Sequence, residues 1–69
     1  MRKNLYLFRH SKKLSQLEMA EKLGYARTTY AAIENGEREG RKTFWDILRK
    51  TFGLTDAEIE ELKEVDKTE

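Results

Sequence analysis

Four glycines and the absence of proline constrain this chain more than any other feature of its sequence. Each glycine lies between segments whose apolar residues recur every three or four positions, the spacing of one helix face. Glycine readily adopts the left-handed conformation that ends a helix. No segment alternates as a strand would. We therefore predict an all-α chain with five helices, carrying the stripes Leu5 and Phe8; Met19, Ala20 and Leu23; Tyr30 and Ile33; Trp45, Leu48 and Phe52; and Ile59, Leu62 and Val65.

Short polar motifs indicate where these helices begin. Ser15 with Glu18, and Thr55 with Glu58, have the spacing of a capping box, in which two side chains satisfy free amides at a helix start. Thr43 and Asp46 form a weaker version of the same motif. Five short helices joined by connections of a few residues predict a compact orthogonal bundle rather than a long coiled coil.

Length and composition limit what the chain can do. Its 69 residues allow one domain, residues 1–69, whose last residues, 66–69, are expected to fray. There is no cysteine and one histidine, His10, which argues against disulfides, metal sites and catalytic triads. The longest apolar run, Leu5–Phe8, is far below the roughly 20 residues of a membrane span. We expect a cytoplasmic protein that is not an enzyme and needs no metal, cofactor or membrane.

Charge is distributed unevenly although the net charge is only +1. Residues 1–13 carry five basic and no acidic side chains, whereas residues 51–69 carry two basic and seven acidic ones. Such a division is expected when one face of a protein meets a polyanion and the far end does not. A solvated mixture of charges explains it equally well, so charge alone leaves both interpretations open.

The segment from Gln16 to Asn35 is the most informative part of the sequence. Two helices held at a steep angle by a short turn need a small residue where the backbones approach, here Ala20, and a positive φ in the turn, here Gly24. The apolar positions that would lock the pair together are also filled, by Met19, Leu23, Tyr25, Tyr30 and Ile33. The alternative is a generic pair of packed helices without a binding role.

The motif LSQLEMAEKLG, followed by IENGER and preceded by Arg9, resembles the Cro and phage-repressor type of helix-turn-helix domain, also called the xenobiotic-response-element family. The resemblance extends from about Leu5 to about Leu62, with the helix-turn-helix unit at about residues 16–35. It implies a compact helical bundle whose third helix lies in the major groove of DNA. It also implies a sequence-specific transcriptional regulator.

The resemblance assigns roles to individual residues. Arg27, Thr28 and Ala32 would face base edges, with Arg27 best suited to bridge the two acceptors of a guanine. Arg9 and Glu34 would form a structural ion pair between the first and third helices. The residues implied to contact phosphates, which set register without reading bases, are Gln16, Thr29, Asn35, Arg38, Arg41 and Lys42.

Several of these residues have competing interpretations. Arg27 could contact a phosphate or remain solvated, and Gln16 could be an ordinary first-turn residue. Asn35 could serve only to end the third helix. Arg9 could contact a phosphate directly. Arg2, with Lys3, could form a flexible electrostatic arm or simply a solubilising end.

The sequence also departs from the family pattern. Ala26 stands where a serine or threonine usually caps the recognition helix, and Ala31 and Ala32 stand where longer polar side chains are common. Gly40 and Arg41 replace a usual proline-serine pair. Short side chains imply few hydrogen bonds to bases, so that specificity would depend on Arg27, Thr28, contacts with thymine methyl groups and DNA shape.

These observations lead to one main functional hypothesis and one competitor. The main hypothesis is a homodimeric repressor of phage or mobile-element type that recognises an inverted repeat. The competitor is a protein-interaction module on the same fold, such as an antitoxin or adaptor. The aromatic and apolar residues of the fourth helix and its end are predicted to be core, with a dimer contact as the alternative: Phe44, Trp45, Phe52 and Leu54. The acidic fifth helix could cover the bundle or form the pairing surface.

Overall fold

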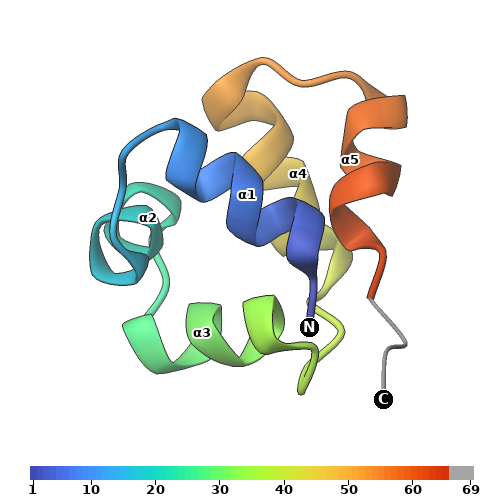
Figure 1. Cartoon of the computed structure of the whole chain (residues 1–69). Helices are drawn as coiled ribbons and strands as arrows, with labels where there is room; N and C mark the ends of the chain where they lie inside the picture. Colours follow the sequence, from blue (N-terminus) through green and yellow to red (C-terminus); the bar gives the residue numbers. More distant parts are fainter. Residues whose placement is uncertain (66–69) are drawn as a thin grey trace.

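A computed structural model describes residues 1–65 and shows that they fold into α-helices joined by short turns (Figure 1). The residues described form no strand, which confirms the predicted all-α class. The five helices are α1 (Lys3–Ser11), α2 (Gln16–Leu23), α3 (Arg27–Asn35), α4 (Lys42–Phe52) and α5 (Asp56–Lys63).

Both predicted capping boxes are present. The Ser15 side chain accepts a hydrogen bond from the Glu18 backbone N–H at 3.0 Å, and the Glu18 carboxylate accepts one from the Ser15 N–H at 2.9 Å. Thr55 and Glu58 make the same pair of bonds at the start of α5. Each pair satisfies amides that the first turn leaves without partners, so these motifs fix where α2 and α5 begin.

The weaker motif at Thr43 was interpreted wrongly. Arg41 is the residue before α4 and makes no side-chain cap, while Thr43 already lies inside the helix. Phe44, Trp45 and Leu48 of this helix are buried in the core. Burial of two aromatic rings and a leucine stabilises the helix by several kcal/mol, on the order of 2 per side chain, which exceeds the contribution of a cap.

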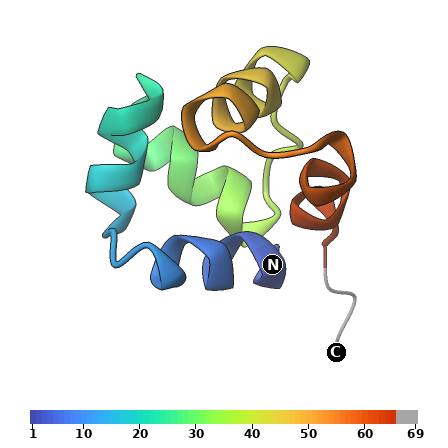
Figure 2. The same ribbon diagram turned by 90° about the horizontal axis from the view of Figure 1, so that it is seen from above.

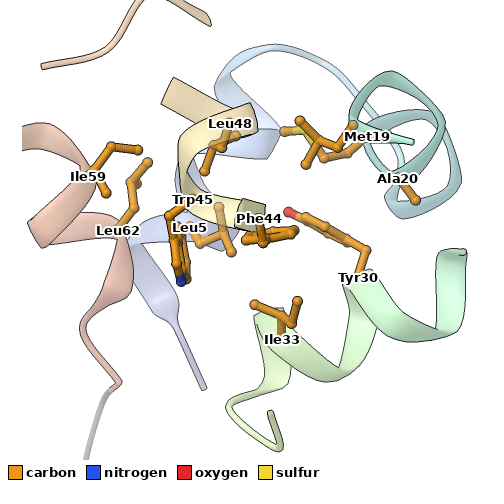
Figure 3. Packing of buried hydrophobic residues seen from close by; sticks show 11 residues of the cluster. Leu5, Met19, Ala20, Tyr30, Ile33, Phe44, Trp45, Leu48, Ile59 and Leu62 are labelled. Atoms are coloured by element: carbon orange, nitrogen blue, oxygen red, sulfur yellow. The ribbon is translucent and has the colours of Figure 1, made fainter. Parts of the chain in front are cut away.

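The hydrophobic core draws side chains from all five helices (Figure 3). Phe44 makes edge contacts with the rings of Tyr25 and Trp45, and Phe8 makes one with Phe52. Phe52 and Leu54 are partly buried against this core, so the core interpretation of the aromatic residues is correct. The buried members are Leu5, Met19, Ala20, Leu23, Tyr30, Ile33, Phe44, Trp45, Leu48, Ile59 and Leu62.

Helix α5 is shorter than its apolar stripe predicted. It ends at Lys63, and Glu64 adopts an extended conformation. Val65 therefore lies outside the helix and is 39% exposed, so its assignment to the stripe was wrong. Another glutamate in the last turn would place negative charge at the negative end of the helix dipole, which disfavours continuation. The prediction that residues 66–69 fray falls outside the residues described.

The helices are arranged so that α3 is held along its inner side only. Helix α2 packs against both α3 and α4, and α1 crosses α3. Helix α5 packs on α1 and α4, on the far side of the molecule from the beginning of α3 (Figures 1 and 2). None of the helices within residues 1–65 combines the length and apolarity that a bilayer crossing requires.

Candidate nucleic-acid interface

Helices α2 and α3 form a steep pair joined by the turn at residues 24–26. Gly24 ends α2 with φ of 79°, and the Tyr25 N–H donates to the Ala20 carbonyl at 2.9 Å. Ala20 is fully buried where the helices meet, as its small size predicted. Ala26 precedes α3 without a side-chain cap. The pair thus has the geometry expected of a helix-turn-helix unit, with an uncapped start to its second helix.

The outer face of α3 is open to solvent where base contacts were predicted. Arg27 and Thr28 are exposed, and Ala32 is half-buried one turn later. The inner face carries Tyr30 and Glu34, which are both buried. Because α5 lies elsewhere, the acidic end of the described chain does not cover the beginning of α3 (Figure 1). A duplex can therefore approach this end of the helix without displacing any part of the described fold.

A buried polar network behind α3 contains the predicted ion pair. The Arg9 guanidinium donates to both Glu34 oxygens, from Nε at 2.8 Å and from Nη2 at 3.2 Å. Its Nη1 donates to the Leu14 carbonyl at 2.8 Å. Tyr30 Oη and Gln16 Nε2 also donate to Glu34, at 2.8 and 3.0 Å. The guanidinium is therefore occupied and buried, which contradicts the alternative of direct phosphate contact by Arg9.

The network shifts the ionisation of its members. Burial alone would raise the pKa of Glu34, but hydrogen bonds from Arg9, Gln16 and Tyr30 hold that pKa below its ordinary value. Burial, together with the neighbouring Glu34 carboxylate, raises the pKa of Tyr30. The bond to Glu34 raises the pKa of Arg9. Near neutral pH the site consequently contains one carboxylate, one guanidinium and a neutral phenol.

Gln16 has a different environment from the one its predicted role suggested. It begins α2, but its side chain is half-buried and its amide nitrogen donates to Glu34. One amide hydrogen remains for another acceptor, and first-turn backbone N–H groups have no intrahelical partner. Gln16 is therefore held in one orientation from within the protein. The sequence did not indicate this second bond.

The other predicted phosphate contacts lie in three different places. One group comes together around a groove of about 480 Å³ between α3, the following turn and the start of α4. This groove is lined by Tyr25, Thr29, Ile33, Arg38, Glu39, Gly40, Arg41 and Phe44. Lys42 instead lines a second hollow with Arg2, Trp45 and Lys63. Asn35 is exposed at the end of α3 and lines neither.

The environment of Arg2 contradicts the expectation that it forms a flexible arm or a solubilising end. It is only 5% exposed and its guanidinium donates to four backbone carbonyls. Burial lowers the pKa of this guanidinium, an effect that the Glu39 carboxylate opposes. No sequence motif marks this role, since backbone carbonyls are common to all residues. Lys3, in contrast, is exposed, but it is the first residue of α1 and so is not part of a flexible arm.

Comparison with protein families agrees with this geometry. A family described as a helix-turn-helix domain matches residues 4–62, which is most of the chain and includes α1 to nearly the end of α5. No curated protein and no solved structure gives a significant match. Within residues 1–65, no group of three or more histidine, cysteine, aspartate or glutamate side chains is placed to hold a metal ion.

Proposed function

This chain belongs to the helix-turn-helix domain family, and we propose that it is a sequence-specific, double-stranded-DNA-binding transcriptional regulator. The observation that carries the proposal is the exposed beginning of α3, with Arg27 and Thr28, beside a groove that brings together Arg38 and Arg41. Exposed donors on a rigid helix can read base edges while neighbouring cations bind the phosphate backbone. No catalytic group, metal or cofactor is needed for this function.

In the proposed complex, the first turn of α3 enters the major groove. Arg27 donates two hydrogen bonds to a guanine, and Thr28 contacts the neighbouring base. The Ala32 methyl group packs against a thymine methyl. Phosphate contacts come from Thr29, Arg38 and Arg41 around the groove, and from Asn35, Lys42 and the start of α2 at Gln16.

We further propose that two copies bind an inverted repeat and repress transcription, as in regulators of phage or mobile elements. Ala31 and Ala32 are short, so one copy of α3 makes few base contacts and discriminates poorly among sequences. Two copies with their α3 helices about one DNA turn apart, roughly 34 Å, would read twice as many base pairs. Occupying a promoter in this way blocks transcription in the cytoplasm.

Selection from a pool of random duplexes tests the proposal. We expect an enriched consensus with two-fold symmetry and binding that weakens steeply with salt. Arg27→Ala should relax the preference at one base position in each half-site, by about 1–3 kcal/mol. Arg41→Ala is the matched control, because loss of a phosphate contact should weaken binding to all sequences alike. No enrichment at low salt would refute the proposal, and the reverse pattern for the two variants would refute the assigned roles.

A protein-interaction module of antitoxin or adaptor type is the second candidate. Short alanines on the outer face of α3 favour it, and so do two exposed leucines, Leu7 at 50% and Leu17 at 48%. Capture of a partner protein in fixed stoichiometry, together with DNA affinity that does not depend on sequence, would support this alternative over the first.

A further inference from the structure

The turn after α3, residues 36–41, contains two of the proposed phosphate contacts, Arg38 and Arg41, but no regular secondary structure. Its first half is held by α3, because the N–H groups of Glu37 and Arg38 both donate to the Ala32 carbonyl, at 2.9 and 3.2 Å. Within residues 1–65, no comparable backbone bond fixes Glu39 or Gly40. The second half of the turn must therefore be held by side chains.

Arg2 supplies most of these bonds. Its Nη1 donates to the Arg38 carbonyl at 2.8 Å and its Nη2 to the Glu39 carbonyl at 3.1 Å. The same guanidinium donates to the carbonyl of Ile33 in α3 and, at 3.0 Å, to that of Lys63 in α5. One buried side chain thus ties the turn to the ends of two helices. Carbonyls at helix ends are favourable acceptors for a cation.

Trp45 forms the other support of the turn. Its indole Nε1 donates to the Glu39 carbonyl at 3.3 Å, and the Arg2 guanidinium lies 5.5 Å from the indole centroid. Gly40 packs so closely on this ring that a Cβ atom there would lie 3.0 Å from Nε1. Arg38 and Arg41 of the same turn line the groove beside Thr29. The buried supports therefore bind the backbone that connects these two arginines.

We propose that Arg2 is a positioning residue for DNA binding. Its side chain is too buried to reach a phosphate, and it acts by holding the turn so that Arg38 and Arg41 lie beside the first half of α3. Without the guanidinium, the carbonyls of Arg38 and Glu39 lose donors and are free to turn toward water. The inference rests on the proposed function, because it assigns these two arginines to the phosphate backbone.

The test compares the wild type with Arg2→Met, which keeps the length of the side chain and removes its donors. Binding to the selected duplex and to a scrambled duplex is measured as a function of salt, at a temperature where circular dichroism shows both proteins folded. The slope of log K against log salt should fall by about 1 to 2, near one for each arginine that no longer reaches a phosphate. Affinity should fall by the same factor on both duplexes, and amide exchange should accelerate at Glu39 and Gly40.

Two controls separate positioning from charge and from stability. Lys50→Met removes one positive charge from an exposed site on α4, outside the proposed interface. Asn4→Ala removes a bond of 3.0 Å to the Glu61 carbonyl, which joins α1 to α5 without touching the turn. Both controls should keep the salt slope of the wild type. Arg2→Lys keeps the charge but not the planar fork of donors, so it should also lower the slope.

Each outcome decides the question. An unchanged slope for folded Arg2→Met overturns the inference, and so does a reduction no larger than that of Lys50→Met. If Arg2→Met does not fold, the slope of Arg2→Lys decides in the same way. Failure of the wild type to bind any duplex would instead refute the proposed function, so the two failures are distinguishable.

Discussion

Two regions of the molecule place a buried arginine beside α3, and they use it differently. In the network around Glu34, Arg9 meets a carboxylate that also bonds side chains from α2 and α3. In the turn after α3, all the hydrogen bonds of Arg2 go to neutral backbone carbonyls. The first region fixes helices to one another, whereas the second fixes a turn to helices already in place. Loss of the first should therefore damage the fold, and loss of the second mainly the function.

The largest expected effect follows from Arg9→Met. This change leaves the Glu34 carboxylate buried without its cation, which typically costs about 3–5 kcal/mol. We expect a loss of that size in the free energy of unfolding, measured by urea denaturation. In a domain of this size, such a loss is a large part of the total stability.

The double variant Arg9→Met/Glu34→Met is the control for this prediction. It removes the unpaired charge, so it should recover part of the lost stability even though Gln16 and Tyr30 lose an acceptor. A double variant that is less stable than Arg9→Met would show that the carboxylate is not the source of the penalty. The distinction between the two regions would then fail.

A smaller effect is expected from Gly40→Ala in the turn. Gly40 has a φ of 78°, which costs an L-residue about 1–2 kcal/mol, and its Cβ would press on the Trp45 indole. We expect a loss of about that size in unfolding free energy, together with weaker binding to all DNA sequences.

Gly53→Ala is the matched control, since Gly53 has a φ of 66° but no atom within 4 Å of a Cβ. It should lose similar stability and retain DNA affinity. Equal DNA affinities for the two variants would contradict a role for the turn in binding.

The contrast between the two regions also explains what the sequence could predict. Helix starts at Ser15 and Thr55 are encoded by neighbouring side chains, so a local motif was sufficient. Glu34 and Arg9 are a charged pair of matching residue types, and the resemblance placed them together. Both predictions were possible because the interacting partners are side chains of particular residue types, which can be identified in the sequence.

The errors and omissions have a common cause in tertiary structure. Arg2 binds backbone carbonyls, which every residue carries. No feature of the sequence therefore distinguished Arg2 from a solvated residue near the end of the chain. Gln16 was assigned one partner, but the fold supplies a second in Glu34. Thr43 has the spacing of a cap, yet α4 begins at Lys42 without a side-chain cap and is stabilised by the burial of Phe44 and Trp45. The roles of individual residues toward DNA remain predictions.

The smallest expected effect is a dependence of the unfolding free energy on pH, which we expect only for the network around Glu34. The pKa of Glu34 is lower in the folded protein than its unfolded value of about 4.3. Its contribution to stability is therefore complete above that value and is lost as pH falls through the folded pKa, because the unfolded chain takes up the proton first.

The effect is small because burial opposes the donors from Arg9, Gln16 and Tyr30. The hydrogen bonds of Arg2 all go to backbone carbonyls, which do not titrate in this range, so we expect no corresponding loss from these bonds. Urea denaturation between pH 7 and pH 3 should show a steeper acid loss for the wild type than for Glu34→Gln, while Arg2→Met should follow the wild type. Parallel curves for the wild type and Glu34→Gln would mean that the bonds to this carboxylate do not favour its charged form.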